Sequence, residues 1–159
     1  MVWFPKMEGG KAMFRGRYEH TIDSKGRISI PSKFREILNK KYDDRLVITN
    51  FDHCLVAFPN EEWFNLVEQK VSTFSLVRKE TSAFLRFFYS SAIDCVIDKH
   101  GRLLIPQTLR DYANFQKDVV LVGEGRFIEI FAKERWQEVA PQVEEDFDQI
   151  RDTLATLGI

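Results

Sequence analysis

Asp23-Ser-Lys-Gly-Arg-Ile-Ser-Ile-Pro-Ser-Lys-Phe-Arg35 recurs later in the chain as Asp98-Lys-His-Gly-Arg-Leu-Leu-Ile-Pro-Gln-Thr-Leu-Arg110. The two stretches share Asp, Gly, Arg, Ile, Pro and the final Arg at a constant offset of 75 residues. Further on the offset becomes 73, so that Trp63 meets Trp136. Self-similarity over so long a span indicates two copies of one structural unit.

Each copy predicts the same order of elements. An alternating strand ends at the Asp, a turn carries the Gly, and a second strand follows. Pro31 and Pro106 then fit the first turn of a short helix, because a proline there forgoes no hydrogen bond. A hairpin comes next, and its expected strands are Leu46–Thr49 with Leu55–Phe58 in the first copy and Val119–Val122 with Phe127–Phe131 in the second.

Two further helices are expected outside the repeated motifs. Helical spacing of Phe84, Phe87 and Phe88 predicts a linking helix packed on the body, in preference to a base-stacking platform. From Trp136 to Leu157 the apolar residues form a nearly heptad seam, which Pro141 should kink or restart. That seam could dock on the chain's own body, but we favour oligomerisation.

One such unit cannot cover both faces of its own sheet, so the two copies should pack as a pseudo-dimer in one β-rich α+β body. The expected organisation is an N-terminal extension over 1–12, a first unit over 13–75, a linking helix over 76–88 and a second unit with a long C-terminal helix over 89–159. Residues 1–12 match nothing in the second copy. They are an extension outside the fold or an artefact upstream of a natural start at Met13.

Charge is distributed unevenly along the 159 residues, although the net charge is only −1. Residues 1–35 carry eight basic against three acidic side chains, and residues 134–159 carry two basic against seven acidic. This balance excludes a protein that coats nucleic acid non-specifically, yet one end can attract an anion. No apolar stretch approaches the ~20 residues of a membrane span, so we expect a cytoplasmic protein without a membrane partner.

Neither catalysis nor metal binding is indicated. Cys54 and Cys95 are isolated and read as buried thiols, with a disulfide as the minor alternative. His20 aligns with Cys95, which favours a core position over a ligand. Gly123-Glu-Gly125 fits a hairpin turn, since no phosphate-binding Gly-Lys follows it. We therefore expect no enzyme, no cofactor, no metal and no small-molecule substrate.

The basic residues of the repeated turns are the candidate site. A turn containing Gly exposes its neighbours at a protein edge, and Arg can donate paired hydrogen bonds to a phosphate or a guanine. The candidate DNA-binding residues are Lys25, Arg27, Lys99 and Arg102, with Arg15 and Arg17 adding charge on the preceding strand. Alternatively, Asp23 and Asp98 pair with Arg27 and Arg102 to brace the turns at Gly26 and Gly101, and the two roles are compatible. We expect Arg35 and Arg110 to brace the fold.

The run Met13-Phe-Arg-Gly16, the Asp23–Arg27 motif followed by Ile30-Pro31, and its copy Asp98–Arg102 resemble the MraZ family over residue 13 to roughly 157. The resemblance implies two AbrB-like swapped-hairpin units forming an intramolecular pseudo-dimer barrel with flanking helices. It also implies a nucleoid-associated transcriptional regulator of the division and cell-wall gene cluster, which binds repeated operator boxes as a ring-like homo-oligomer. DNA contact would fall on Lys25 and Arg27. The second copy departs from the pattern, because Lys99 and His100 reverse the order of Ser24 and Lys25.

Sequence-specific binding of double-stranded DNA is therefore the leading functional hypothesis. The alternative is an antitoxin-like or scaffolding oligomer whose basic turns meet an acidic protein. A hydrolase ranks third, because no nucleophile elbow is present and the carboxylates cluster on the last helix.

Overall fold

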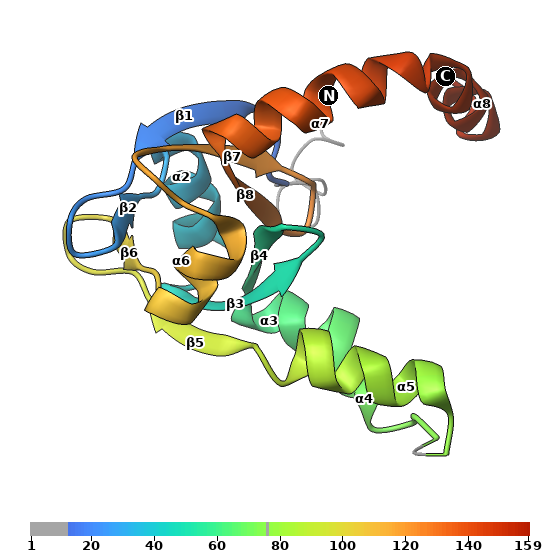
Figure 1. The fold of residues 1–159 in the computed structure, drawn as a ribbon, viewed down its shortest axis with the longest axis horizontal. Helices are drawn as coiled ribbons and strands as arrows, with labels where there is room; N and C mark the ends of the chain where they lie inside the picture. The colour runs from blue at the N-terminus through green and yellow to red at the C-terminus, as the bar shows by residue number, and fades with distance from the viewer. Residues whose placement is uncertain (1–12, 76) are drawn as a thin grey trace, which may run out of the picture.

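The computed structural model describes residues 13–75 and 77–159 as a mixed α+β fold with two antiparallel sheets (Figure 1). The larger sheet has the strand order β1-β7-β8-β4-β3-β5. Its strands are β1 (Arg17–Thr21), β3 (Arg45–Phe51), β4 (Cys54–Pro59), β5 (Ile93–Val96), β7 (Asp118–Gly123) and β8 (Ile128–Ala132). The smaller sheet is a ribbon of β2 (Arg27–Ser29) and β6 (Arg102–Leu104).

The two repeats exchange strands in the larger sheet. β1 of the first repeat pairs with β7 of the second, and β5 of the second pairs with β3 of the first. Between them, β4 and β8 join the two hairpins at the centre. Each repeat therefore completes its sheet with the other, which confirms the swapped-hairpin pseudo-dimer.

The expected barrel is open. Among the described residues, β1 and β5 are edge strands of the larger sheet, and the ribbon is a separate sheet. Only isolated bridges extend the pairing, such as that between Ile22 and Ile28. β2 and β6 have three residues each, which is too short to carry a continuous ladder around the body.

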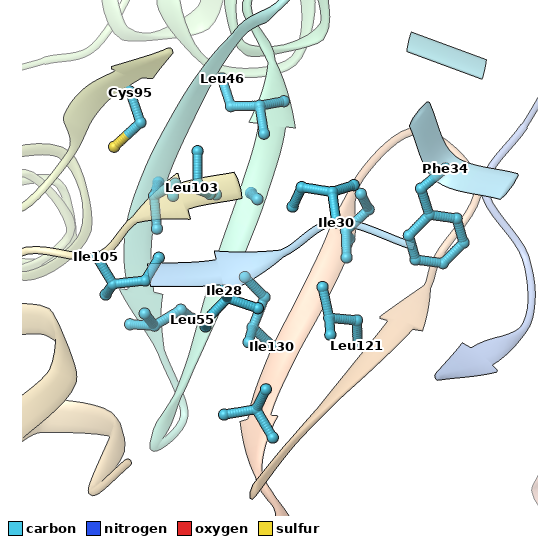
Figure 2. Packing of buried hydrophobic residues seen from close by; sticks show 14 of the residues in the cluster. Ile28, Ile30, Phe34, Leu46, Leu55, Cys95, Leu103, Ile105, Leu121 and Ile130 are labelled. Atoms are coloured by element: carbon cyan, nitrogen blue, oxygen red, sulfur yellow. The ribbon is translucent and has the colours of Figure 1, made fainter. Parts of the chain in front are cut away.

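The core lies between the ribbon and the larger sheet (Figure 2). Ile28 and Leu103 point inward from the ribbon and are fully buried. They meet Leu55, Leu121 and Ile130 from the larger sheet. Each side chain of this kind stabilises the fold by about 1.5–3 kcal/mol when it leaves water, so the ribbon is anchored although few hydrogen bonds hold it.

The helices of the two motifs cover this core. α2 (Ser32–Lys41) and α6 (Gln107–Ala113) begin directly after Pro31 and Pro106, as expected. α2 buries Phe34 and Leu38, and α6 buries Leu109 and Ala113.

A helical hairpin follows β4 and leads back to β5. Its outgoing arm is α3 (Asn60–Trp63), the π-helix η1 (Phe64–Glu68) and α4 (Gln69–Val71), and its returning arm is α5 (Lys79–Phe84) with the π-helix η2 (Leu85–Tyr89). The arms pack through stacked rings, including Trp63 on Phe88 and Trp63 on Tyr89. The linking helix expected from residue 76 thus begins at Lys79, and residue 76 lies outside the described residues, as does the extension over 1–12.

The C-terminal helix does not restart at Pro141, which was one of the two alternatives expected there. α7 (Lys133–Glu145) runs through Pro141, and the chain breaks at Asp146 before α8 (Phe147–Thr156). Proline removes one backbone hydrogen bond, but Pro141 and Gln137 are exposed, so the carbonyl left without a donor can face water. Beyond α7 the helix projects away from the sheets (Figure 1).

Three smaller expectations have mixed outcomes. Cys54 and Cys95 are free and buried, and burial raises the pKa of both thiols, that of Cys95 to about 11. His20 lies on the edge strand β1 and is only partly buried, and its Nδ1 is 2.7 Å from the carbonyl oxygen of Ser29. The core position expected for it was therefore wrong. Phe87 is more exposed than a core residue.

No helix in the described parts of the chain has the length and apolarity to span a membrane.

Candidate nucleic-acid interface

Both repeated turns adopt the same hydrogen-bonded geometry. In the first, Oδ1 of Asp23 accepts hydrogen bonds from the backbone N–H groups of Lys25 and Arg27, each at 2.9 Å. In the second, Oδ1 of Asp98 accepts from the N–H groups of His100 at 2.8 Å and Arg102 at 2.9 Å. The second motif, in which Lys99 and His100 replace Ser24 and Lys25, therefore has the same backbone hydrogen bonds as the first.

Each aspartate also orients the arginine of its own turn. Oδ2 of Asp23 accepts from Nε of Arg27 at 2.7 Å, and Oδ2 of Asp98 accepts from Nε of Arg102 at 3.0 Å. The backbone N–H of the arginine, reinforced by its side chain, lowers the pKa of each carboxyl below its ordinary value. Both aspartates are therefore charged at neutral pH.

The terminal nitrogens of these two arginines remain available. Among the described residues, neither Arg27 nor Arg102 uses a terminal NH2 group in a hydrogen bond, since only Nε is engaged. A guanidinium held through Nε keeps its two outer nitrogens in a fixed plane, which is the geometry of paired hydrogen bonds to a phosphate or a guanine. Bracing of the turn and contact with an anion are thus compatible in this geometry.

The ribbon brings the two turns together at one edge of the molecule (Figure 1). Arg27 lies opposite Leu104 and Ser29 lies opposite Arg102, so the two arginines occupy diagonal positions on the same outward face. The inward face carries Ile28 and Leu103. Backbone hydrogen bonds tie the turns to the ribbon, because Gly101 accepts from Ile30 at 2.9 Å and Gly26 accepts from Ile105 at 2.8 Å.

Arg35 and Arg110 reach this edge from the opposite repeat, which sequence reasoning did not find. A Cβ placed on Gly26 would lie 2.6 Å from the guanidinium carbon of Arg110, and one on Gly101 would lie 2.6 Å from a terminal nitrogen of Arg35. Each turn therefore carries an arginine on its own strand and another from the partner helix. The alignment of Arg35 with Arg110 was a visible signal of paired roles, but the strand exchange that crosses them is not visible in the sequence.

Six basic side chains and two carboxylates thus meet at this edge, which we call the cationic edge: Lys25, Arg27, Arg35, Lys99, Arg102 and Arg110 with Asp23 and Asp98. Lys25 and Lys99 are exposed and form no ion pair within 13–75 and 77–159. The acidic helices α7 and α8 lie away from this edge (Figure 1).

The two halves of the cationic edge differ in their surroundings. A cavity of about 410 Å³ beside the second turn is lined by Arg35 and Lys99 but also by Asp43 and Asp44. Asp43 pairs with Arg45, whereas Asp44 forms no ion pair with a described residue. The equivalent neighbour of the first turn is Lys117, whose carbonyl oxygen accepts from Ile22. The first turn is therefore the more positive of the two.

Arg15 and Arg17 do not lie at the cationic edge. Arg17 begins β1, six residues before Asp23, which corresponds to about 20 Å of extended chain. Its guanidinium sits over the ring of Trp136, with Cζ 5.2 Å from the ring centroid. The backbone of Arg15 lies against Gly123 at the other end of the sheet. Strand polarity separates these two residues from the turns.

Titratable clusters elsewhere serve the fold. Buried Glu62 joins Tyr42 to Arg126, with a 2.7 Å ion pair to the arginine. Among the described residues, no three His, Cys, Asp or Glu side chains converge as a metal site would require. The cationic edge is thus the strongly positive cluster among the described residues that faces solvent, opposite in sign to the exposed carboxylates of α7 and α8.

Comparison with known proteins gives a consistent match. A family model described as "MraZ protein, putative antitoxin-like" matches residues 13–87 and again residues 88–157. A protein of Thermoanaerobacter sp. (strain X514), named Transcriptional regulator MraZ, is 44% identical over 147 residues, which is 92% of this chain and 100% of the relative. A protein of the same name from Ligilactobacillus salivarius (strain UCC118) is 45% identical over 142 residues, covering 89% of this chain and 96% of its own. The similarity spans both repeats.

Proposed function

This chain belongs to the MraZ family, and on that premise we propose that it is a transcriptional regulator that binds double-stranded DNA sequence-specifically through the cationic edge. The observation that carries the proposal is the outward face of the β2–β6 ribbon, where Arg27 and Arg102 are held by Asp23 and Asp98 with their terminal nitrogens free. A two-stranded ribbon fits the major groove, and oriented arginines there can read guanine.

Lys25 and Lys99 would contact the phosphates beside the groove, and Arg35 and Arg110 would add charge to each turn. Phosphate contacts supply affinity, whereas the arginines on the ribbon would supply specificity. Arg15 and Arg17, which lie away from the turns, have no part in this proposal.

Several copies would act together on repeated operator boxes, in a ring-like assembly located at the nucleoid in the cytoplasm. A single chain of net charge −1 would bind DNA only weakly through its two turns. When several copies are linked, each bound copy raises the effective concentration of the next, so the overall affinity increases. The regulated genes would be those of division and cell-wall synthesis, as the family resemblance implies.

The test begins by selecting bound fragments from genomic DNA and measuring their affinity by fluorescence anisotropy. Arg27→Ala should weaken binding by about 5- to 150-fold, the range of one paired contact to a base. Arg78→Ala is the matched control, because Arg78 is exposed, forms no ion pair with a described residue and lies on the helical hairpin. Undiminished affinity of a folded Arg27→Ala protein would remove the proposed contact.

The description of the family as antitoxin-like favours one second candidate, in which the cationic edge binds an acidic protein. Capture from a lysate with and without nuclease separates the two. A partner protein retained after nuclease treatment, by wild type and not by Arg27→Ala, would support this candidate, whereas recovery of DNA alone supports the regulator.

A further inference from the structure

Leu104 is an exposed apolar side chain on the ribbon that carries the cationic edge. It lies in β6 and is 57% exposed. Its neighbours in the chain, Leu103 and Ile105, point into the core and are fully buried (Figure 2). Side chains alternate along a strand, so Leu104 is on the outward face, where Arg27 and Arg102 also lie.

The first repeat has a polar residue at the equivalent position. At the offset of 75 residues Leu104 aligns with Ser29. Ser29 is exposed, and its hydroxyl forms no hydrogen bond within 13–75 and 77–159. The outward face of the ribbon thus carries two arginines, one serine and one leucine. Because the arginines match between the repeats, the serine and the leucine are what distinguish the two strands of this face.

The register of the ribbon places the leucine beside one arginine and the serine beside the other. Leu104 is directly opposite Arg27, and Ser29 is directly opposite Arg102. Side chains opposite each other in an antiparallel pair have Cβ atoms about 4.5–5.5 Å apart. Successive base pairs of DNA are separated by about 3.4 Å along the helix axis. When Arg27 contacts a guanine in the major groove, Leu104 therefore faces an adjacent base pair.

The major groove offers an apolar side chain one specific partner. Thymine presents its 5-methyl group there, and apolar side chains contact that methyl group. The other base edges present hydrogen-bond donors and acceptors, which a leucine would cover without pairing them, at a cost in binding free energy. A serine hydroxyl can donate to a base or accept from one, so it selects less strictly.

We propose that Leu104 is a specificity-determining residue that contacts the 5-methyl group of a thymine next to the guanine contacted by Arg27. The inference rests on the proposed DNA binding and assigns one further base of the recognised sequence. The base pair next to the guanine contacted by Arg102 carries no such requirement, because Ser29 faces it. The two strands of the ribbon therefore recognise different sequences although their arginines match.

Replacement of thymine by uracil tests the contact, because uracil lacks only the 5-methyl group. Each thymine of a selected fragment is replaced in turn, and the affinity is measured by fluorescence anisotropy. The guanine contacted by Arg27 is the one whose replacement by 7-deazaguanine, which lacks the N7 acceptor, weakens binding of wild type but not of Arg27→Ala. Uracil at the thymine next to that guanine should weaken wild-type binding about fourfold, the equivalent of the ~0.8 kcal/mol contributed by one buried methyl-sized group.

Three variants assign the effect to its side chain, once circular dichroism shows that each is folded. Leu104→Ser introduces the residue of the first repeat and should bind the thymine and uracil fragments equally. Val96→Thr is the matched control and should keep the uracil effect, because Val96 is 61% exposed in the same repeat but lies on the larger sheet, outside the ribbon. Ser29→Leu should create a second uracil-sensitive thymine, next to the guanine contacted by Arg102, in a fragment that carries thymine there.

Other outcomes overturn the contact. If no thymine lies next to that guanine, or if uracil there leaves wild-type affinity unchanged, Leu104 contacts no methyl group and the proposed DNA binding stands without it. If the uracil effect persists in Leu104→Ser or is lost in Val96→Thr, another side chain contacts the methyl group. If Leu104→Ser keeps the uracil effect and lowers self-association in sedimentation, the leucine belongs to a contact between copies. If wild type binds no DNA, the proposed function fails and the contact fails with it.

Discussion

Gly26→Ala should destabilise the fold and, separately, weaken DNA binding. Gly26 has φ of +85°, a backbone region that costs a residue with a Cβ about 1–2 kcal/mol. For a chain of this size that cost corresponds to a fall in Tm of roughly 2–8 °C. The new Cβ would also lie 2.6 Å from the guanidinium carbon of Arg110, so that arginine must leave the turn.

Displacement of Arg110 should cost little stability. Among the described residues its one side-chain hydrogen bond runs from a terminal nitrogen to Oε1 of Gln107 at 2.9 Å, and its buried Nε has no partner to lose. Loss of its charge from the first turn should instead weaken DNA binding about tenfold, the equivalent of about 1.4 kcal/mol for a charge-assisted contact.

Gly125→Ala separates the two effects. Gly125 has nearly the same φ, +84°, but a Cβ there would meet nothing closer than the sulfur of Met13 at 3.9 Å. It should lose similar stability and keep its DNA affinity. The assays are thermal unfolding by circular dichroism at one protein concentration and anisotropy with selected DNA. A Gly26→Ala protein with the Tm of wild type would refute the backbone argument, and affinity equal to that of Gly125→Ala would refute a role for Arg110.

Three further predictions concern charge. Arg102→Ala should weaken DNA binding less than Arg27→Ala, because Asp44 already offsets the second turn; an equal loss in anisotropy titrations would contradict that asymmetry. Wild-type affinity should fall steeply with salt, and Lys25→Ala should reduce the slope of log K against log salt by about 0.9. Burial, with Glu124 nearby, raises the folded pKa of Glu129 to about 7, so its protonated form is favoured and stability falls as pH rises toward 7. Glu129→Gln should therefore raise Tm relative to wild type at pH 8 and leave it unchanged at pH 4, as scanning calorimetry would show.

Local elements of the fold could be predicted because each depends on short spacings. The alternation that ends at Asp23, the prolines that open α2 and α6, and the hairpin strands follow from rules that act over a few residues. The restart expected at Pro141 was wrong because a single proline costs one hydrogen bond, which water replaces on an exposed face. The seam itself indicates that face, because Pro141 lies two residues from both Val139 and Val143 and therefore opposite the apolar side.

The candidate site could be predicted only in part, for a reason of topology. Lys25 and Arg27 belong to a turn that is readable from its own residues. Arg110 belongs to the same surface only because β1 pairs with β7 and β5 with β3, which carries each helix to the other repeat's turn. Arg17 is near the turn in sequence, yet an extended strand carries it away.

Strand exchange also explains why the cationic edge cannot form from a single repeat. Since the arginine of each helix completes the turn of the other copy, a cationic edge requires both repeats in one fold. Two copies in one chain can also differ from each other, and here the second turn has acidic neighbours, while the second hairpin is followed by the long acidic helices α7 and α8. Screening limits each charge to about 10 Å at ordinary salt, so an arm that projects from the far side does not oppose DNA at the cationic edge. The nearly neutral total charge therefore hides two separated surfaces of opposite sign, and this separation would allow the proposed DNA binding at the cationic edge without opposition from the acidic C-terminal helices.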